Sequence, residues 1–359
     1  MPHATVRDIA REAAVSVATV SRALNGHSNV RPEVRARIES VAARLGYVPH
    51  AAARHLSSAK SGMIGVVVPD LHGEFFSELL RGMDREASER GLYCMMMVMH
   101  GDARRGVAAL HAMRGRVDGL VVMAPQVSAD ELLAHLPVGM PAILVNCAPG
   151  RSARAELRID NVAGASALVE HLIATGRRRL VHISGPVGNI DADERLRGAQ
   201  AACARAGLSL RVMAGDFREP SGAAAATTLI EDGADFDAIF AANDMMAIGA
   251  MITLKRAGIV IPDQIAICGF DDIPLTRLIS PSLTSASIDI ASFGASAVAR
   301  LVKAIAGDDH NGVEQRKPVV IVRESTGPAR HASQGLHSGH DPFNVHNNKP
   351  EQSGQGELS

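Results

Sequence analysis

Residues 5–26 read TVRDIAREAAVSVATVSRALNG, and this stretch holds two short helical patterns separated by a tight turn. Thr5 followed by Asp8 is a capping pair for a helix start, and apolar residues at helical spacing come next. The pattern breaks before Ser16, which opens a second short helix that the Asn-Gly pair at 25–26 closes. Two short helices around a tight turn are typical of the first part of a helix-turn-helix unit.

A third helix follows within the predicted head of the chain, residues 1–48. Pro32 suits the first helical position, Gly46 ends the helix, and apolar residues such as Val34 and Ile38 recur on its inner face. Three short helices in this order predict an all-α helix-turn-helix headpiece that binds DNA. A generic three-helix bundle with one solvated face is the alternative that the helix pattern alone leaves open.

Polar side chains on the second helix fit contact with a nucleic acid. Ser16, Thr19 and Ser21 carry short hydroxyls suited to phosphate oxygens, and Arg22 can pair bidentately with a guanine. Residues 1–60 hold nine Arg and Lys against four Asp and Glu, although the whole chain has a net charge of -1. A basic head on an acidic body indicates that the head meets a polyanion.

The run at 5–26, continued by VRPEVRARI and LGYVPHAAARHL, resembles the headpiece of the lac repressor/galactose repressor (LacI) family of transcription regulators. The resemblance implies that Val17, Ala18 and Arg22 face base edges. It implies phosphate contacts by Ser16, Thr19, Ser21 and Asn25, and Thr5 and Asn29 complete the predicted DNA-binding set of the head. Because Val17 and Ala18 can at most contact a thymine methyl or fit the groove, Arg22 is expected to be the main hydrogen-bonding reader.

Ala14 departs from the family pattern, which usually has Gly at this turn position. A positive φ at this residue costs an alanine roughly 1 kcal/mol relative to glycine. The packed head can absorb a strain of that size, so the helix-turn-helix prediction stands.

Residues 49–61 are predicted to form a hinge between the head and the rest of the chain. The segment AAARHLSS at 51–58 can form a helix that is too short to be stable alone. The family resemblance implies a helix that folds only on DNA, with Leu56 prying apart a central base step in the minor groove. It implies close helix contact at Ala53 and a phosphate near Arg54. A plain linker is the alternative, which the two serines of the segment favour.

Strands and helices alternate strictly through residues 62–328, which predicts an α/β domain built from parallel sheets. Strands are expected at 63–69, 93–99, 118–124, 142–146, 179–185, 211–217, 237–244 and 264–270. Helices are expected at 75–91, 162–175, 194–206, 221–232 and 245–257, and a further one follows the second strand and ends at 116. One small domain needs fewer strands, so two similar lobes are expected.

Polar and aromatic residues follow the carboxyl ends of the predicted strands, where ligands bind in such folds. They are Asp70, Phe75, Phe76, Asp160, Asn161, Asp191, Arg195, Phe217, Asn243, Asp244, Asp271 and Asp272. Such carboxylates and amides can exchange hydrogen bonds with several hydroxyls while aromatic faces pack a sugar ring. Each Asp can equally be a helix N-cap, with Asp160 and Asp244 the strongest examples. As a set, they predict a cleft for a polyhydroxylated small molecule.

The runs GRRRLVHISGP, ERLRGAQAAC, FAANDMMAIGAM and ICGFDDIPLTRLISPSLTS resemble the sensor core of the same family, related in fold to periplasmic sugar-binding proteins. The resemblance implies effector contact by Phe75, Phe76, Asp160, Asp191, Arg195, Phe217, Asn243 and Asp271, and Asp70 completes the predicted effector-binding set. It also implies three crossings between two lobes. Lobe one is expected at about 62–160 and 290–319, and lobe two at about 161–289 and 320–328.

Several absences limit the class of protein. The sequence lacks a phosphate-binding glycine loop, a nucleophile elbow and clustered metal ligands, so no cofactor, no metal site and no enzyme are predicted. Its start lacks the apolar core of a signal peptide, and no window approaches the roughly 18 apolar residues of a membrane span. A cytoplasmic protein without a membrane partner is expected. Residues 329–359 lack periodicity and leucine heptads, which predicts a disordered tail and no coiled-coil tetramer.

These features predict a repressor of transcription that binds a pseudo-palindromic operator as a homodimer, with its affinity controlled by a sugar or sugar derivative. The alternatives are a sugar transport component, an enzyme acting on a sugar, and a regulator that has lost its effector or responds to a protein. The attached head opposes the first, and the lack of a nucleophile–base set opposes the second. Retention of Arg195, Asn243 and Asp271 opposes the third. The effector's identity and the direction of control are not encoded in these patterns.

Overall fold

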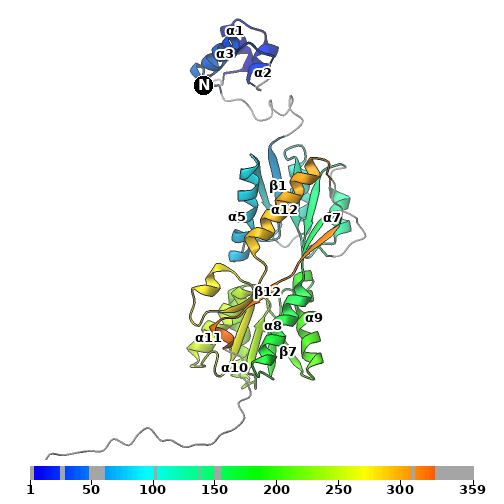
Figure 1. Ribbon diagram of the computed structural model, residues 1–359, viewed down its shortest axis with the longest axis vertical. Helices are drawn as coiled ribbons and strands as arrows, with labels where there is room; N and C mark the ends of the chain where they lie inside the picture. Colours follow the sequence, from blue (N-terminus) through cyan, green and yellow to red (C-terminus); the bar gives the residue numbers. More distant parts are fainter. Residues whose placement is uncertain are drawn as a thin grey trace, which may run out of the picture.

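The computed structural model describes residues 4–24, 29–47, 61–100, 103–136, 139–148, 155–308 and 312–327. It has a small all-helical head and an α/β body of two stacked lobes (Figure 1), which confirms the predicted fold class. Within these residues, no helix combines the length and the apolar character needed to cross a membrane.

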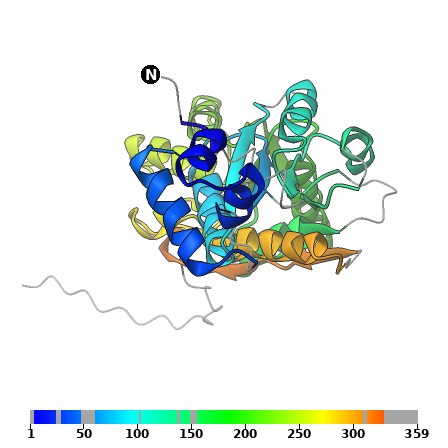
Figure 2. The same cartoon turned by 90° about the horizontal axis from the view of Figure 1, so that it is seen from above.

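The head contains α1 (Val6–Glu12), α2 (Val17–Leu24) and α3 (Pro32–Arg44), which lie together as one small bundle in both views (Figures 1 and 2). Its core is formed by one fully buried side chain from each helix, Ile9, Val20 and Ile38. The predicted capping pair is confirmed, because the backbone N–H of Thr5 donates to the Asp8 carboxylate at 3.0 Å and the Thr5 hydroxyl accepts from the Asp8 backbone N–H.

The turn between α1 and α2 requires a left-handed residue, as the family pattern indicated. Ala14 occupies this turn with a φ of +50°. The turn is closed by the backbone N–H of Val15, which donates to the carbonyl of Ala10 at 3.0 Å. Alanine therefore carries a strain of roughly 1 kcal/mol that glycine would avoid.

Lobe one is built on a six-stranded parallel sheet in the order β11-β5-β4-β3-β1-β2. Its strands are β1 (Met63–Val68), β2 (Tyr93–Val98), β3 (Gly119–Met123), β4 (Ala142–Val145), β5 (Glu156–Ile159) and β11 (Val313–Arg316). Its helices are α5 (Glu74–Glu89), α6 (Ala103–Met113), α7 (Ala129–His135) and α12 (Ile290–Ile305). Helices α5 and α12 pack closely on one another, since a Cβ at Gly82 would overlap the carbonyl oxygen of Ala291.

Lobe two is built on a second six-stranded sheet, in the order β12-β10-β9-β8-β6-β7. Its strands are β6 (Leu180–Ile183), β7 (Leu210–Met213), β8 (Ala238–Ala241), β9 (Ala266–Asp271), β10 (Thr284–Ser287) and β12 (Val319–Ile321). Its α-helices are α8 (Asn161–Ala174), α9 (Ile190–Arg205), α10 (Glu219–Glu231) and α11 (Asp244–Arg256), with the 3-10 turns η1 (Pro274–Arg277) and η2 (Glu324–Thr326). The edge strand β12 runs antiparallel to β10, so this sheet is not wholly parallel as expected.

The chain passes between the two sheets three times. The passages lie between β5 and α8, between β10 and α12, and between β11 and β12. These three connections join the two lobes (Figure 1). The exact domain boundaries given above stay a prediction.

The sequence patterns did not predict α7, α12 and the four strands β5, β10, β11 and β12. These strands have three or four residues each, and most are rich in polar side chains, so they lack the apolar run that marks a buried strand. β10 shows how such a strand is buried. Its Ser285 hydroxyl donates to the Asp244 carboxylate at 2.6 Å, and its Thr284 hydroxyl donates to the carbonyl of Arg323 at 3.2 Å.

Candidate functional site

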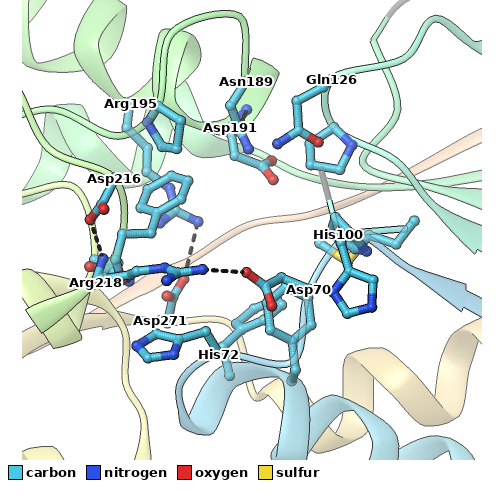
Figure 3. Close-up of a pocket in the computed structure, with 18 residues that line it drawn as sticks. Asp70, His72, His100, Gln126, Asn189, Asp191, Arg195, Asp216, Arg218 and Asp271 are labelled. Atoms are coloured by element: carbon cyan, nitrogen blue, oxygen red, sulfur yellow. Dashed lines mark hydrogen bonds and ion pairs between the residues drawn. The ribbon is translucent and has the colours of Figure 1, made fainter. Parts of the chain in front are cut away.

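A cavity of about 360 Å³ lies between the two lobes, at the carboxyl ends of their strands (Figure 3). Lobe one contributes Pro69, Asp70, His72, Phe75, Phe76, His100, Met123, Pro125 and Gln126. Lobe two contributes Pro186, Asn189, Asp191, Arg195, Asp216, Phe217, Arg218, Asn243 and Asp271. A cavity of this size with both apolar and polar walls suits a small organic ligand.

Arg195, on α9, is the centre of the lobe-two wall. Its side chain is only 4% exposed and forms an ion pair with Asp271 at 3.1 Å. Its Nε–H donates to the side-chain oxygen of Asn161 at 2.9 Å, and its guanidinium lies 3.8 Å from the ring centroid of Phe270. A guanidinium held from three directions has a fixed orientation, so its remaining N–H groups can meet a ligand in one geometry.

The carboxylates beside Arg195 are buried. Burial raises the pKa of Asp271 to about 6, although the neighbouring Arg195 opposes the rise. Burial also raises the pKa of Asp191, again against the influence of Arg195. Asp244 lies behind Asp271 with its pKa raised by burial and by the Asp271 charge. Clustered carboxyls with raised pKa values are typical of functional sites.

Helix starts hold two further residues of this wall. Asn243 caps α11, because its side-chain oxygen accepts from the backbone N–H of Met246 at 3.0 Å, and its amide N–H donates to the carbonyl of Phe217 at 2.9 Å. Asn189 caps α9 in the same way, accepting from the backbone N–H of Asp191. The expected cap at Asp244 is therefore wrong, because Asn243 takes that position and Asp244 is the first helical residue.

The lobe-one wall is different in character. Phe75 and Phe76 open α5 and meet edge to face, with their ring centroids 5.2 Å apart. Pro69, Met123 and Pro125 extend this apolar surface. Such a surface can pack against the C–H face of a sugar ring.

Polar contacts between described residues connect the lobes around the cleft. The Arg218 guanidinium pairs with the Asp70 carboxylate at 3.2 Å, as the dashed line in Figure 3 shows. The backbone N–H of Leu275 donates to Glu74 at 3.0 Å, and that of Ile190 donates to the carbonyl of Pro125 at 3.0 Å. These contacts fix the position of one wall relative to the other.

Three of the seven described non-glycine residues with a positive φ line the cleft. His100, Phe217 and Asp271 all line it, and their φ values are +52°, +69° and +105°. Residues other than glycine rarely adopt such φ values, because each costs on the order of 1–3 kcal/mol. Strain of this kind is typical of sites that hold side chains in a functional geometry.

Eight of the nine residues predicted to bind effector line this cavity: Asp70, Phe75, Phe76, Asp191, Arg195, Phe217, Asn243 and Asp271. Asp160 does not line it, and its carboxylate caps α8 by accepting from the backbone N–H of Ala163 at 3.0 Å. Among the polar residues of the cavity, the predicted set lacks His72, His100, Gln126, Asn189, Asp216 and Arg218. All of these follow a strand end, so the same strand-end argument would have found them.

The exposed face of α2 is the candidate DNA-binding surface. Ser16, Ala18 and Arg22 are exposed, and Val17 keeps 47% of its surface although it is apolar. Arg22 is steadied by its Nε–H, which donates to the carbonyl of Ala18 at 3.2 Å. A basic side chain and an exposed valine on one face suit a DNA groove.

The hydroxyls of this surface have local roles as well. The Ser16 hydroxyl accepts from the backbone N–H of Thr19 at 3.1 Å, so it caps the start of α2. Thr19 and Ser21 are half-buried, Thr5 and Asn29 are exposed. The predicted DNA contacts Asn25, Ala53, Arg54 and Leu56 lie outside the described residues.

In the part of the chain that the structure describes, no three His, Cys, Asp or Glu side chains are grouped as ligands for a metal ion.

Two family models match the chain. Residues 5–50 match bacterial regulatory proteins of the lacI family, and residues 169–326 match a periplasmic binding protein-like domain. The first covers α1 to α3, and the second covers most of lobe two with α12 and β11 of lobe one.

Curated relatives match along most of the chain. Catabolite control protein A of Priestia megaterium is 31% identical over 307 residues, which cover 83% of this chain and 92% of the relative. The ribose operon repressor of Escherichia coli K12 is 32% identical over 79% of this chain and 87% of the relative.

Solved structures share the whole arrangement. The lac repressor dimer bound to operator and the anti-inducer ONPF has a TM-score of 0.82 at 25% identity, covering 91% of this chain and 100% of that one. A complex of the transcriptional regulator CelR with cellobiose has a TM-score of 0.68 at 27% identity, and the match covers 90% of this chain and 99% of that one.

Proposed function

The chain belongs to the lacI family of bacterial transcriptional regulators, and on that premise we propose that it represses transcription as a homodimer whose operator affinity depends on an uncharged, polyhydroxylated effector. The head binds DNA and the cleft binds the effector. Its curated relatives are regulators, and we propose that the cleft binds its ligand without turnover. The protein acts where the DNA lies, in the cytoplasm.

The α2 surface supports the DNA half of the proposal. Arg22 provides a bidentate donor for a guanine, and Val17 and Ala18 fit the groove or a thymine methyl. Ser16, Thr19, Ser21, Thr5, Asn25 and Asn29 complete the proposed contacts to the DNA. One head reads only a half-site, so a homodimer reads a site with two-fold symmetry. The lac repressor dimer bound to operator supports this arrangement.

The hinge and the lobe boundaries belong to the same proposal. Residues 49–61 connect the head to the body, with Ala53, Arg54 and Leu56 in the minor groove. We take the two lobes to divide along the two sheets, and the strand membership of those sheets supports this division. A ligand that changes how the lobes face one another then changes the spacing of the heads.

The charge balance of the cleft supports the part of the proposal that concerns the effector. Arg195 is paired with Asp271, and Arg218 is paired with Asp70, so both arginines are already neutralised. Asp191 and Asp216 remain as further carboxylates in the wall. A phosphorylated ligand would meet net negative charge, whereas hydroxyl groups can donate to these carboxylates. The relatives named for ribose and cellobiose support an uncharged sugar.

Selection from a random DNA pool, followed by fluorescence anisotropy at fixed salt, tests this function. The selected duplex should have two-fold symmetry, and its affinity should change at least about ten-fold with one sugar among D-ribose, D-galactose, D-glucose and cellobiose. D-ribose 5-phosphate and D-glucose 6-phosphate should have no effect. Failure to select a common sequence would contradict the DNA half, and a response to a sugar phosphate alone would contradict the effector half.

A further inference from the structure

Asn161 stands at the passage from lobe one to lobe two. It is the first residue of α8 and is only 1% exposed. Its neighbours tie it to the lobe-one sheet, because the backbone N–H of Asp160 donates to the carbonyl of Arg316 at 2.8 Å. Asn161 is not among the residues that line the cavity. Its effect on a ligand must therefore pass through other side chains.

The amide of Asn161 bonds to two residues that do line the cavity. Its oxygen accepts from the Nε–H of Arg195 at 2.9 Å. Its N–H donates to the carboxylate of Asp191 at 2.8 Å, and the Glu194 carboxylate lies 3.3 Å from the same nitrogen. One group thus faces a cation on one side and carboxylates on the other.

Only a side chain with both a donor and an acceptor can make both contacts. An ionised aspartate would accept from Arg195 but would face Asp191 and Glu194 with a third negative charge. A leucine would leave Arg195 Nε and an Asp191 oxygen buried without this partner. Burial raises the pKa of Asp191, so this carboxylate is sensitive to the loss of a donor.

We propose that Asn161 is a positioning residue of the effector site, which fixes Arg195 and Asp191 in the orientation that the ligand requires. The proposal rests on the proposed function of the cleft. Because Asn161 also begins the helix after the lobe crossing, the placement of these two side chains is fixed relative to the hinge. Effector affinity therefore depends on a residue that the effector does not touch.

Two variants test this role with whichever of the four sugars named above the wild type binds most tightly. N161L should bind that sugar at least about ten-fold more weakly at every pH, because two hydrogen bonds to charged groups are lost. N161D should bind as weakly at pH 8. At pH 5.5 its affinity should move toward that of the wild type at the same pH. Burial and the Asp191 and Glu194 charges raise the pKa of the introduced carboxyl, and its protonated form has one donor and one acceptor, as the amide does.

Thr175→Ala provides the matched control. Thr175 is a buried polar residue at the other end of α8, and its hydroxyl donates to the carbonyl of Leu172 at 2.7 Å. This variant should lose some thermal stability and keep the sugar affinity of the wild type. An N161D deficit that stays the same at pH 8 and pH 5.5, or N161L affinity within about two-fold of the wild type, would overturn the proposal.

Crystal structures of the full-length wild type and N161L decide the question without a ligand. The proposal requires that Arg195 or Asp191 adopts another rotamer or bonds to a new partner in N161L. If both side chains keep their places, the proposal is wrong. If the wild type binds none of the four sugars, the effector part of the proposed function fails, and the crystal comparison still decides the role of Asn161.

Discussion

The two walls of the cleft differ in how their side chains are held. On the lobe-two wall, Arg195, Asp191 and Asp271 are buried and joined to each other or to Asn161 by hydrogen bonds. On the lobe-one wall, Phe75 and Phe76 provide an apolar surface. A fixed polar wall gives specificity, since each donor and acceptor has one position, whereas an apolar wall adds contact area with little direction.

The difference also has a cost in stability. Lobe two buries a guanidinium and several carboxyl groups, and two strained backbone positions, Phe217 and Asp271, lie in the same wall. Buried charges and left-handed backbone destabilise a fold unless other contacts compensate. Changes in the lobe-two wall should therefore alter stability and binding together, and changes in the lobe-one wall should alter mainly binding.

Arg195→Met should have the largest effect. It removes one partner of a buried pair and leaves Asp271 and Asp191 without their cation, so the free energy of unfolding should fall by about 3–5 kcal/mol. Urea denaturation followed by circular dichroism measures the change. Arg211→Met is the control, because its pair with Asp232 is exposed and its loss should change stability by less than about 1 kcal/mol. Equal losses in the two variants would contradict the claim that burial makes the Arg195 pair important for stability.

The pH dependence of stability should also come from lobe two. His182 is fully buried, and burial lowers its pKa from 6.5 to about 4. The unfolded chain therefore takes up a proton first, and this residue's contribution to stability falls as the pH decreases from 6.5 to 4. The loss should be about 3 kcal/mol.

His182→Asn isolates this contribution, because the amide can still donate to the carbonyl of Phe240 in place of the ring Nδ1. Asp271 acts in the opposite direction. Its pKa is raised to about 6, so its contribution falls as the pH rises from about 4 to 6. The two effects partly cancel in the wild type. The prediction is that H182N loses less stability than the wild type between pH 7 and pH 4, and identical pH profiles would contradict it.

Phe76→Leu tests the lobe-one wall. Leucine keeps an apolar side chain but removes the aromatic face, so sugar affinity should fall by about 1 kcal/mol, or roughly five-fold. Isothermal titration calorimetry measures the affinity. A larger loss of affinity than that of Arg195→Met would reverse the roles that we assign to the two walls.

The smallest effect should come from the contact between the walls. Asp70 and Arg218 are about half exposed, so their pair should contribute less than about 1 kcal/mol to lobe closure and should weaken with salt. D70R or R218D alone should lower sugar affinity slightly through repulsion, and the double variant should restore it. No recovery in the double variant would show that the pair does not act between the lobes.

The sequence predicted the lobe-two wall better than its surroundings. Asn243 and Asp271 lie at strand ends, and Arg195 lies in the helix that follows β6. All three belong to long recognisable runs, and the topology brings these positions together. Asp160 has the same residue type and the same kind of position, yet it caps α8. Sequence cannot separate these roles, because an N-cap and a ligand contact both favour a short polar side chain after a strand.

Other features depend on contacts between distant residues. The pairing of Arg218 with Asp70 joins positions in different lobes, and no local pattern signals it. Strand β10 is buried through hydroxyl bonds to Asp244 and Arg323, so its polar sequence conceals its place in the sheet. The positive φ of Ala14 agrees with the family pattern, which usually has Gly at this turn position.

The most direct test of the account compares wild type with Arg195→Lys on the selected operator, by fluorescence anisotropy with and without the active sugar. Lysine keeps the charge beside Asp271 but lacks the planar fork that bonds to both Asn161 and Asp271. We predict that R195K binds the operator as the wild type does and that its response to the sugar shifts to at least about ten-fold higher sugar concentration. An unchanged sugar response in R195K would contradict the claim that the lobe-two wall controls binding to DNA.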